Sequence, residues 1–338
     1  MRLLVVKTSS LGDVIHTLAA LSDARAALPR LEVDWLVEEA YREVPAWHPA
    51  VREVIPCALR RWRRTPLRSW FGPEWRALRT RLRSTRYDLV LDAQGLLKSA
   101  LLALPARGPL AGRGFGSVRE RAAALFYRYR LPVPADWPEV EQLRELFAQA
   151  LGYARPKTPA EFGIDSARFA WNPGVPATGP YAVLLHGAGW PTKLWPEAHW
   201  VELAQALRTR GIAVKLPWGS PGEEARAQRI AQAAGGEVLP RLGVGELARV
   251  IAPARFCVGL DTGLTHLSVA IGTRTATLYG PSVPVFAGVA HGELLNLCST
   301  GATTVDTRRP TTVPVQRVLQ ALEPWLGADA LRPRSAGR

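Results

Sequence analysis

The stretch Arg255-Phe-Cys-Val-Gly-Leu-Asp-Thr-Gly-Leu-Thr-His266 decides the fold prediction for the whole chain. Its first half, Phe256 to Leu260, is a short apolar run that is typical of a buried strand. Asp261 and Thr262 then belong to the residue types that cap helices. Apolar residues recur after them at helical spacing, at Leu264, Leu267, Ala270 and Ile271. The stretch therefore predicts a strand, a tight turn and a helix.

The start of this helix is a candidate phosphate site. The amides of Thr262, Gly263 and Leu264 have no partner within the helix, and the helix dipole favours an anion there. Gly263 has no side chain to block the approach of a ligand. His266 lies one turn into the helix and points back over its start. The alternative is an ordinary strand-to-helix turn with an Asp cap.

The alternation of strand and helix continues on both sides of this stretch. In the second half we expect strands at 181–185, 213–218, 256–260 and 274–279, with helices at 197–210 and up to about 234. In the first half we expect strands at 2–7, 33–37, 51–55 and 87–91, and a helix that ends at Pro29. The pattern predicts an α/β fold with parallel sheets and helices on both faces.

A Pro- and Gly-rich segment near the midpoint, residues 171–180, is the expected hinge between two domains. It separates an N-terminal domain, 1–170, from a C-terminal domain, 181–326, each long enough for its own core. Residues 327–338 are expected to be a frayed tail. The helix near 315–326 is a candidate to cross back over the hinge. Ligands are expected at the carboxyl ends of the strands.

The composition is that of a globular protein: 47% of the 338 residues are hydrophobic and 21% are charged. Charges interrupt the apolar runs, as Asp92 and Lys98 do, so we expect no membrane span. The apolar run at the N-terminus is too short for the hydrophobic region of a signal peptide. The three cysteines are far apart and have neither metal-ligand nor redox spacing, which favours the cytoplasm.

The net charge of +14 is concentrated between Arg60 and Arg86, where ten arginines accompany one acid, Glu74. Such a run indicates nucleic acid, an anionic membrane surface or an acidic substrate, and the alternative is a basic face that is merely solvated. A nucleic-acid-binding protein is disfavoured, because the run carries no recognition-helix or RNP-type motif. Filter binding to DNA at physiological salt would test that alternative.

Several nucleotide- and metal-binding motifs are absent from the sequence. Without a G-x-x-x-x-G-K-[ST] or a G-x-G-x-x-G after a strand, a dinucleotide oxidoreductase is disfavoured. No Asp-x-Asp and no His/Cys cluster has the spacing of a metal site. A leaving diphosphate must then be neutralised by cations and helix N-termini. Lys193 and the turn at Asp261 to Gly263 are suited to hold an ADP- or UDP-like group.

Asp13 is the candidate general base in the first domain. It follows the polar turn after the first strand and can take a proton from an attacking hydroxyl. An Asp in the first helical turn is also favoured by the helix dipole alone, which is the alternative. The same position should lower its pKa, so that proton removal comes late in the transition state.

Six motifs, in this order along the chain, carry a resemblance to a known family. They are Lys7-Thr-Ser-Ser-Leu-Gly-Asp-Val-Ile-His-Thr-Leu18, Val37-Glu-Glu39, Ile55-Pro56 with Arg60-Arg-Trp-Arg-Arg64, Asp92-Ala-Gln-Gly95 with Lys98-Ser99, Lys215-Leu-Pro-Trp-Gly219 and Asp261-Thr-Gly-Leu-Thr-His266. Together they look like the lipopolysaccharide heptosyltransferases of glycosyltransferase family 9, type I, over residues 1 to about 326.

The resemblance implies a GT-B fold, in which two Rossmann-like domains have parallel sheets that face each other across a cleft. It implies inverting, metal-independent transfer without a cofactor, from ADP-L-glycero-D-manno-heptose to the Kdo of Kdo2-lipid A in the lipopolysaccharide inner core. The protein is then expected to be a monomer in the cytoplasm, peripheral on the cytoplasmic face of the inner membrane, touching its anionic surface and binding no nucleic acid. The nearest alternative is heptosyltransferase II, which adds heptose to heptose. The Arg60 to Arg64 cluster favours type I, because its acceptor is densely anionic.

The resemblance also implies roles for individual residues. Asp13 is the catalytic base, and Lys193 is the second catalytic residue. The expected donor-binding residues are Ala188, Gly189, Lys193, Glu223 (ribose), Leu242 (adenine), Asp261, Thr262, Gly263 and His266. The expected acceptor-binding residues are Ser10, Arg60, Arg61, Arg63, Arg64, Lys98 and Arg119, and no residue is expected to bind a metal. Gly187-Ala-Gly189 replaces a more hydroxylic stretch of relatives, so backbone amides must serve there.

Overall fold

The computed structural model describes residues 1–64, 72–169, 179–280, 284, 292–299 and 311–327. The chain forms two compact units, Met1–Asp165 and Ser166–Arg338. Most of the expected hinge, 171–180, and all but the first residue of the expected tail, 327–338, lie outside the described residues. No helix in the described ranges is both long enough and apolar enough to span a bilayer.

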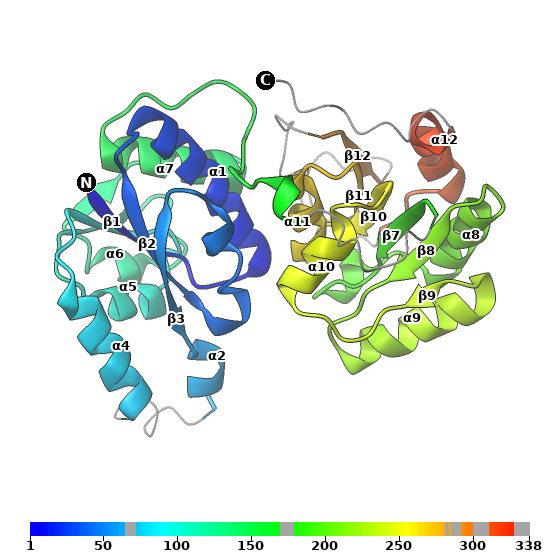
Figure 1. Ribbon diagram of the computed structural model, residues 1–338. Helices are drawn as coiled ribbons and strands as arrows, with labels where there is room; N and C mark the ends of the chain where they lie inside the picture. The colour runs from blue at the N-terminus through cyan, green and yellow to red at the C-terminus, as the bar shows by residue number, and fades with distance from the viewer. Residues whose placement is uncertain (65–71, 170–178, 281–283, 285–291, 300–310, 328–338) are drawn as a thin grey trace. The chain divides into compact units, whose positions relative to one another are not determined.

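The first unit is a parallel sheet of six strands in the order β3-β2-β1-β4-β5-β6. The strands are β1 (Arg2–Val6), β2 (Glu32–Glu38), β3 (Val51–Cys57), β4 (Leu89–Asp92), β5 (Leu110–Arg113) and β6 (Tyr129–Leu131). The helices are α1 (Leu11–Ala27), α2 (Leu59–Trp62), α4 (Pro73–Ser84), α5 (Leu97–Ala103), α6 (Arg121–Ala124) and α7 (Glu139–Leu151). Because side chains alternate along a strand, each strand contributes residues to the packed layers on both faces of the sheet. Helices α1 and α7 pack together (Figure 1), whereas α2, α4, α5 and α6 share a core around Leu4 and Val6.

The second unit repeats this architecture, with the strand order β12-β11-β10-β7-β8-β9. The strands are β7 (Tyr181–Leu185), β8 (Ala213–Leu216), β9 (Glu237–Val238), β10 (Phe256–Leu260), β11 (Thr275–Tyr279) and β12 (Leu294–Cys298). The helices are α8 (Glu197–Arg208), α9 (Pro221–Ala234), α10 (Val244–Ile251), α11 (Gly263–Ile271) and α12 (Val315–Leu326). Two parallel α/β sheets confirm the predicted fold class.

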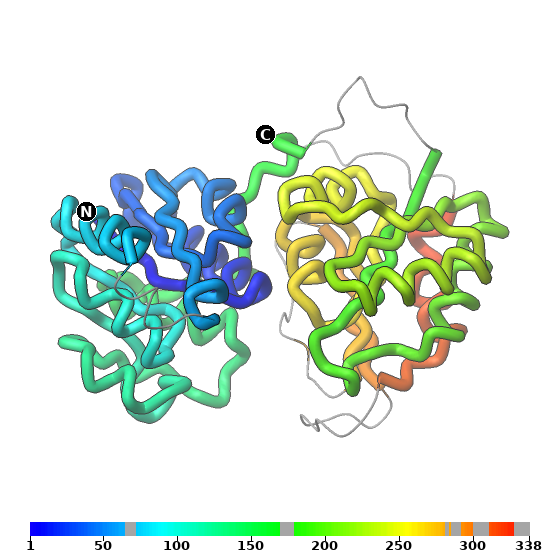
Figure 2. Tube along the Cα trace, turned by 90° about the horizontal axis from the view of Figure 1, so that it is seen from below, coloured from blue at the N-terminus to red at the C-terminus, as the bar shows by residue number. Residues whose placement is uncertain are grey.

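The last helix, α12, which is expected to cross back over the hinge, buries its apolar face within the second unit. It packs against α8 (Figure 2), and its apolar residues Val318, Leu322 and Trp325 are buried in the core of the second unit. The structure therefore assigns α12 to the sheet that precedes it in the chain.

Both sheets reverse their direction of growth next to their first strand. In the first unit the chain moves outward from β1 to β3 and returns to the other side of β1 with β4. In the second unit β7 and β10 occupy the equivalent positions. Loops on either side of such a reversal separate at the carboxyl ends of the strands and leave room for a ligand. The turns after β1, β4, β7 and β10 are therefore where binding residues should be sought.

Candidate functional site

The turn after β1 is held in place by the turn after β4. The side-chain oxygen of Gln94 accepts hydrogen bonds from the amides of Thr8 and Ser9, both at 3.1 Å. Asp92, which is fully buried, accepts from the amide of Gln94 at 2.9 Å and from the hydroxyl of Tyr127 at 2.7 Å. Burial raises the pKa of Asp92, although these hydrogen bonds oppose the shift. The Asp92-Ala-Gln-Gly95 motif thus fixes the position of the turn that precedes Asp13.

Asp13 lies in the first turn of α1, and both of its oxygens are engaged. One accepts hydrogen bonds from the amide of Ser10 at 2.8 Å and from the Ser10 hydroxyl at 3.2 Å. The other lies 2.7 Å from Arg119 Nη2 and 3.7 Å from Lys7 Nζ. The side chain remains 16% exposed. The structure thus brings together three residues that the sequence assigned, Ser10, Asp13 and Arg119, and adds Lys7.

A second carboxylate, Glu139 at the start of α7, binds the same cations. One of its oxygens lies 3.2 Å from Lys7 Nζ, 3.2 Å from Arg119 Nη2 and 2.9 Å from Arg113 Nη2. The ammonium group of Lys7 also donates to the carbonyl of Ala93 at 2.9 Å. The result is a network of three cations and two carboxylates at the carboxyl ends of β1, β4 and β5.

The network keeps both carboxyl groups ionised. Burial opposes the charged form of Asp13, but the charges of Lys7 and Arg119 and the hydrogen bonds from Arg119 and Ser10 outweigh it, so its pKa lies well below the ordinary range. Burial likewise opposes ionisation of Glu139, whose pKa is nevertheless lowered to about 2 by Lys7, Arg113 and Arg119. Burial lowers the pKa of Lys7, against the pull of both carboxylates. Asp13 is therefore an ionised and weak base at neutral pH.

The four arginines of the predicted acceptor cluster fall into two pairs. Arg60 donates to the Tyr41 hydroxyl and lies over its ring, and Arg61 donates to Glu74 at 2.7 Å. Arg63 and Arg64, at the end of α2, are exposed and have no ion pair within the described part of the chain. Lys98, on α5, is half-buried and likewise has no charged partner among the described residues. Arg63, Arg64 and Lys98 are thus the cations that are open to an anion.

On the second unit, Lys193 and His266 converge on Asp261. The Lys193 ammonium group, in the short 3₁₀ helix Pro191–Lys193, donates to Asp261 Oδ2 at 2.5 Å and to the Asp261 carbonyl at 3.1 Å. His266 Nε2 lies 3.3 Å from Asp261 Oδ1, which confirms that this side chain points back over the helix start. Burial opposes ionisation of Asp261, but His266 and Lys193 hold its pKa well below its usual range.

The start of α11 differs from an ordinary capped turn. Thr262 is the N-cap residue, its side chain makes no capping hydrogen bond, and Asp261 is occupied by Lys193 and His266. The expectation that Asp261 caps the helix is therefore wrong, because its carboxylate oxygens are occupied by Lys193 and His266. No described group accepts a hydrogen bond from the amides of Gly263 and Leu264, and both residues are partly exposed. These amides and the helix dipole are suited to bind an anion.

Glu223 lies across the neighbouring turn. Its Oε2 atom accepts hydrogen bonds from the amides of Gly219 at 2.8 Å and Ser220 at 3.1 Å, where it caps α9. A Cβ atom at Gly187 would lie 2.4 Å from the other oxygen, Oε1. Glycine at 187 therefore lets the Glu223 carboxylate reach the turn after β7. Since β8 neighbours β7 in the sheet, Glu223 lies at the same edge as Lys193.

The remaining predicted donor residues lie on the same side of the second sheet. Ala188 and Gly189 belong to the turn after β7; Ala188 packs on the core, and a Cβ at Gly189 would meet nothing within 4 Å. Leu242 is half-buried on the connection from β9 to α10. In the described ranges, no group of three or more His, Cys, Asp or Glu side chains is arranged to hold a metal ion.

A model of glycosyltransferase family 9, the heptosyltransferases, matches residues 75–313. The chain belongs to glycosyltransferase family 9. It is therefore a glycosyltransferase, and the resemblance found in the motifs is confirmed.

Curated relatives in family 9 distinguish the two types. Lipopolysaccharide heptosyltransferase 1 of Pseudomonas aeruginosa is 51% identical over 297 residues, which are 86% of this chain and 82% of that protein. The protein of the same name from Escherichia coli K12 is 46% identical over 88% of this chain and 93% of its own. Lipopolysaccharide heptosyltransferase 2 of the same strain is only 26% identical, over 85% and 84%. The chain is thus much more similar to type 1.

Solved structures of family 9 members show the same fold. E. coli heptosyltransferase WaaC with ADP-2-deoxy-2-fluoro heptose has a TM-score of 0.79 and 41% identity, covering 96% of this chain and 99% of that one. E. coli ADP-heptose LPS heptosyltransferase II, with a TM-score of 0.73 and 23% identity over 96% and 98%, is similar in fold. Both neighbours support the GT-B class.

Proposed function

We propose that the protein transfers L-glycero-D-manno-heptose, with inversion, from its ADP derivative to the Kdo of Kdo2-lipid A during assembly of the lipopolysaccharide inner core. The observation that carries the proposal is the pair of charged sites at equivalent sheet reversals. The first unit holds an ionised carboxylate among cations, and the second holds a lysine beside free helix amides. These are the groups that a hydroxyl nucleophile and a departing diphosphate require.

The second unit supplies the donor site in this proposal. A lysine ammonium group has three donors, and Asp261 accepts two of them from Lys193. The third is left for the diphosphate, together with the amides of Gly263 and Leu264. Asp261 acts as a positioning residue, because its own negative charge would repel a phosphate. Glu223 accepts hydrogen bonds from the ribose hydroxyls, and Leu242 lies beside the adenine.

The first unit supplies the base. An acceptor hydroxyl held at Asp13 attacks C1 of the heptose, the bond from C1 to the diphosphate oxygen breaks, and the hydroxyl proton passes to Asp13. ADP leaves with the bonding electron pair, on the side opposite to the attack, so the configuration at C1 is inverted. Because the pKa of Asp13 is low, its proton transfer comes late, after the C1–O bond has largely formed.

The acceptor is proposed to dock on Ser10, Lys98, Arg119 and the Arg60–Arg64 cluster, which match the carboxylates and phosphates of Kdo2-lipid A. The greater identity to type 1 relatives supports this acceptor over the heptosylated acceptor of type 2. We further propose domains at 1–170 and 181–326 with a hinge at 171–180. The protein acts as a monomer in the cytoplasm, at the inner face of the inner membrane.

The direct test is a transfer assay with ADP-heptose against Kdo-lipid A, Kdo2-lipid A and a heptosylated acceptor. Product is expected with a Kdo-terminated acceptor and not with the heptosylated one. Transfer to the heptosylated acceptor alone would replace the proposal by a type 2 activity. Failure with every acceptor, by protein that still binds ADP-heptose, would reject the acceptor assignment.

Adding EDTA to the transfer assay is expected to leave the rate unchanged. The reason is that Lys193 and the amides of α11 supply the positive charge that a metal ion would otherwise bring to the diphosphate. The initial rate is compared before and after dialysis against the chelator, with added Mg²⁺ as the control. Strong inhibition that Mg²⁺ reverses would show a metal requirement.

Replacing Arg60, Arg61, Arg63 and Arg64 by Ala is expected to raise the KM for the acceptor severalfold or more, while donor affinity stays nearly constant. Most of the effect should come from Arg63→Ala/Arg64→Ala, because Arg60 and Arg61 already bind Tyr41 and Glu74. The KM for the acceptor is measured at rising salt, which screens the contact.

The matched control for this cluster is Arg76→Ala/Arg79→Ala, two exposed arginines of the same basic run. This pair should change the KM for the acceptor much less. If both pairs of substitutions raised the KM equally, the cluster would contribute only general positive charge and not a specific acceptor site. An unchanged KM in the quadruple variant would mean that the four arginines are merely solvated.

A further inference from the structure

Exposed apolar side chains are concentrated at one edge of the first unit. Of the eight large apolar side chains that are exposed in the described residues, six lie between positions 101 and 129. They are Leu101, Leu104, Phe115, Leu125, Phe126 and Tyr129, and Leu125 is 67% exposed. Single exposed apolar residues are normal on a protein surface, but a group of this kind marks an interaction site.

The fold places these residues on neighbouring elements, which we name the α5–α6 face. Leu101 and Leu104 lie on and just after α5, and Leu125 and Phe126 directly follow α6. Helix α5 packs against α6. Tyr129 begins β6, which is the edge strand of the sheet. The α5–α6 face therefore belongs to one unit and is formed by consecutive segments of the chain, with α5 and α6 packed together (Figure 1).

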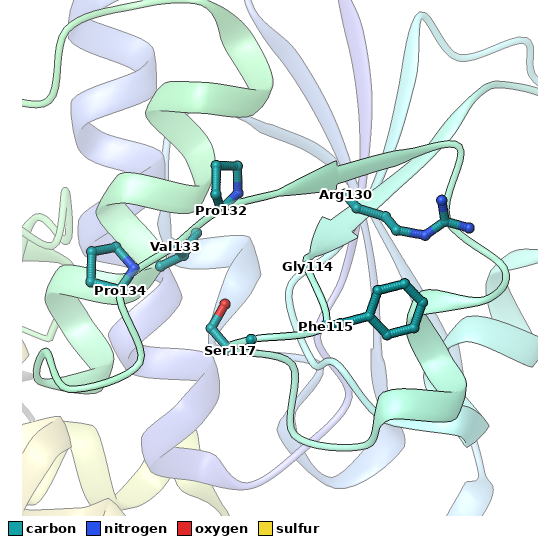
Figure 3. Close-up of a pocket in the computed structure, with 8 residues that line it drawn as sticks. Gly114, Phe115, Ser117, Arg130, Pro132, Val133 and Pro134 are labelled. Carbon is teal, nitrogen blue, oxygen red and sulfur yellow. The ribbon is translucent and has the colours of Figure 1, made fainter.

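Exposed arginines accompany the apolar side chains of the α5–α6 face in the sequence, and two of them contact its aromatic rings. Arg107, Arg121, Arg128 and Arg130 are all exposed. The guanidinium of Arg130 lies 5.4 Å from the ring of Phe115, and that of Arg128 lies 5.6 Å from the ring of Tyr129. Phe115 and Arg130 also line a cavity together with Pro132, Val133 and Pro134 (Figure 3).

Almost no negative charge offsets these arginines. Between residues 101 and 130 the sequence contains one acid, Glu120. Its Oε2 atom accepts a hydrogen bond from the amide of Leu97 at 2.7 Å, so it is committed to the start of α5. The α5–α6 face thus combines exposed leucine and aromatic side chains with unopposed arginines. Peripheral proteins use this combination at an anionic lipid surface, where apolar groups enter the interface and arginines meet phosphates.

We propose that the α5–α6 face docks on an anionic bilayer. This inference rests on the proposed function, because an acyl-chain-bearing acceptor is itself anchored in the bilayer. The face is also connected to the candidate base. Arg119, which binds Asp13 at 2.7 Å, is two residues before the exposed Arg121, and the amide of Glu120 donates to the carbonyl of Gly95 at 3.0 Å. Docking there brings the head of a membrane-held acceptor to the loop that touches Asp13.

The charge of the chain argues against a second copy as the occupant. With a net charge of +14, two copies that met through the α5–α6 face would bring eight exposed arginines together with few acids between them. Such like-charge contact opposes association. An anionic bilayer offers phosphates to the same arginines and an apolar interior to the leucines. The α5–α6 face is therefore complementary to an anionic bilayer in both charge and apolar character, which favours a bilayer over a second copy of the chain.

The test is co-sedimentation of the full chain with vesicles of phosphatidylcholine alone and of phosphatidylcholine with phosphatidylglycerol. The wild-type protein is expected to bind the anionic vesicles and to be released by salt. Leu125→Gln/Phe126→Gln should weaken this binding about tenfold or more, because both side chains are lost from the lipid interface. Both residues are already exposed, so the fold should tolerate the change.

A second pair separates charge from apolar contact. Arg128→Gln/Arg130→Gln should lower binding to anionic vesicles and flatten its salt dependence. The matched control is Arg210→Gln/Arg249→Gln, two exposed arginines of the second unit, which should bind like the wild type. Equal losses in all arginine pairs would overturn the proposal in favour of non-specific attraction. Unchanged binding in the Leu125/Phe126 variant would also overturn it.

Two further measurements keep this inference separate from the proposed function. With an acceptor that lacks acyl chains, the Leu125/Phe126 variant should transfer heptose like the wild type, and its KM should rise only with vesicle-embedded acceptor. A wild-type protein that binds vesicles but transfers to neither acceptor would reject the proposed function and leave the docking surface standing. Light scattering checks self-association: a wild-type dimer that the variant abolishes would assign the face to a second copy and overturn the proposal.

Discussion

Asp13→Asn is expected to lower kcat by about 10²- to 10⁴-fold, the usual contribution of a general base, while donor binding survives. The amide keeps the shape of the side chain and can still accept from Ser10, but it cannot take a proton from the acceptor hydroxyl. Single-turnover transfer gives the rate, and calorimetry with ADP gives the donor affinity. A near-normal kcat would remove Asp13 from the mechanism.

Two controls make the Asp13 result specific. Asp136→Asn changes an exposed carboxylate of the same unit and should leave kcat unchanged. The pH profile supplies a second readout. A carboxyl group with a lowered pKa stays ionised until the pH falls through that pKa, here below the ordinary value of 3.8. Asp13 should therefore cause no loss of activity near neutral pH, and a fall in rate between pH 5 and 7 that disappeared in Asp13→Asn would contradict the charge network.

Lys193→Ala is expected to cost on the order of 2.7–4 kcal/mol in the transition state, or about 10²- to 10³-fold in kcat. The variant removes the cation that we propose to face the departing diphosphate, and it leaves Asp261, whose side chain is 8% exposed, without its Lys193 partner. Because part of the loss then comes from Asp261, thermal unfolding is measured alongside kcat. Lys193→Arg keeps the charge and should restore part of the rate. An effect confined to the KM for the acceptor would move Lys193 to the acceptor site.

Much of the fold could be predicted because its strands are buried on both faces. Strands of this kind read as uninterrupted apolar runs, and the strands at 181–185 and 256–260 have the predicted bounds in the structure. The expected end of α9 at Ala234 also agrees, where Gly235 adopts the left-handed conformation that ends helices. The alternation of these elements was enough to predict two parallel sheets.

The elements without a prediction are mostly short or lie at the sheet edge. Strand β6 has only three residues, and Tyr129 and Arg130 in it are exposed, so no apolar run marks it. Strand β5 contains Gly112, against which the ring of Tyr127 packs so closely that a Cβ would lie 2.4 Å away. Helix α7 is different: Val140, Leu143 and Phe147 are spaced as one helical face, a pattern that would have predicted it.

The candidate site was only partly accessible to sequence reasoning. Asp261 directly follows a strand, and Asp13 lies in the first turn of the helix after the first strand, so both positions could be found from local pattern. Glu139 has no such signal, because its partner Lys7 is 132 residues away and the two meet only through the packing of α7 on α1. The sequence placed Lys193 near the turn at Asp261 to Gly263, but it did not show that the two side chains, 68 residues apart, bind each other.

The cations around Asp13 also affect how the proposed base would lose its proton between turnovers. In the proposed mechanism Asp13 takes the acceptor's proton and must release it before the next sugar is transferred. Lys7 and Arg119, against the effect of burial, make the protonated form a strong acid, and its side chain is 16% exposed to water. The proton can therefore pass to solvent directly, with no relay of side chains. Because the protonated form is a strong acid, loss of the proton to water should be fast, and it should not limit the rate of the catalytic cycle.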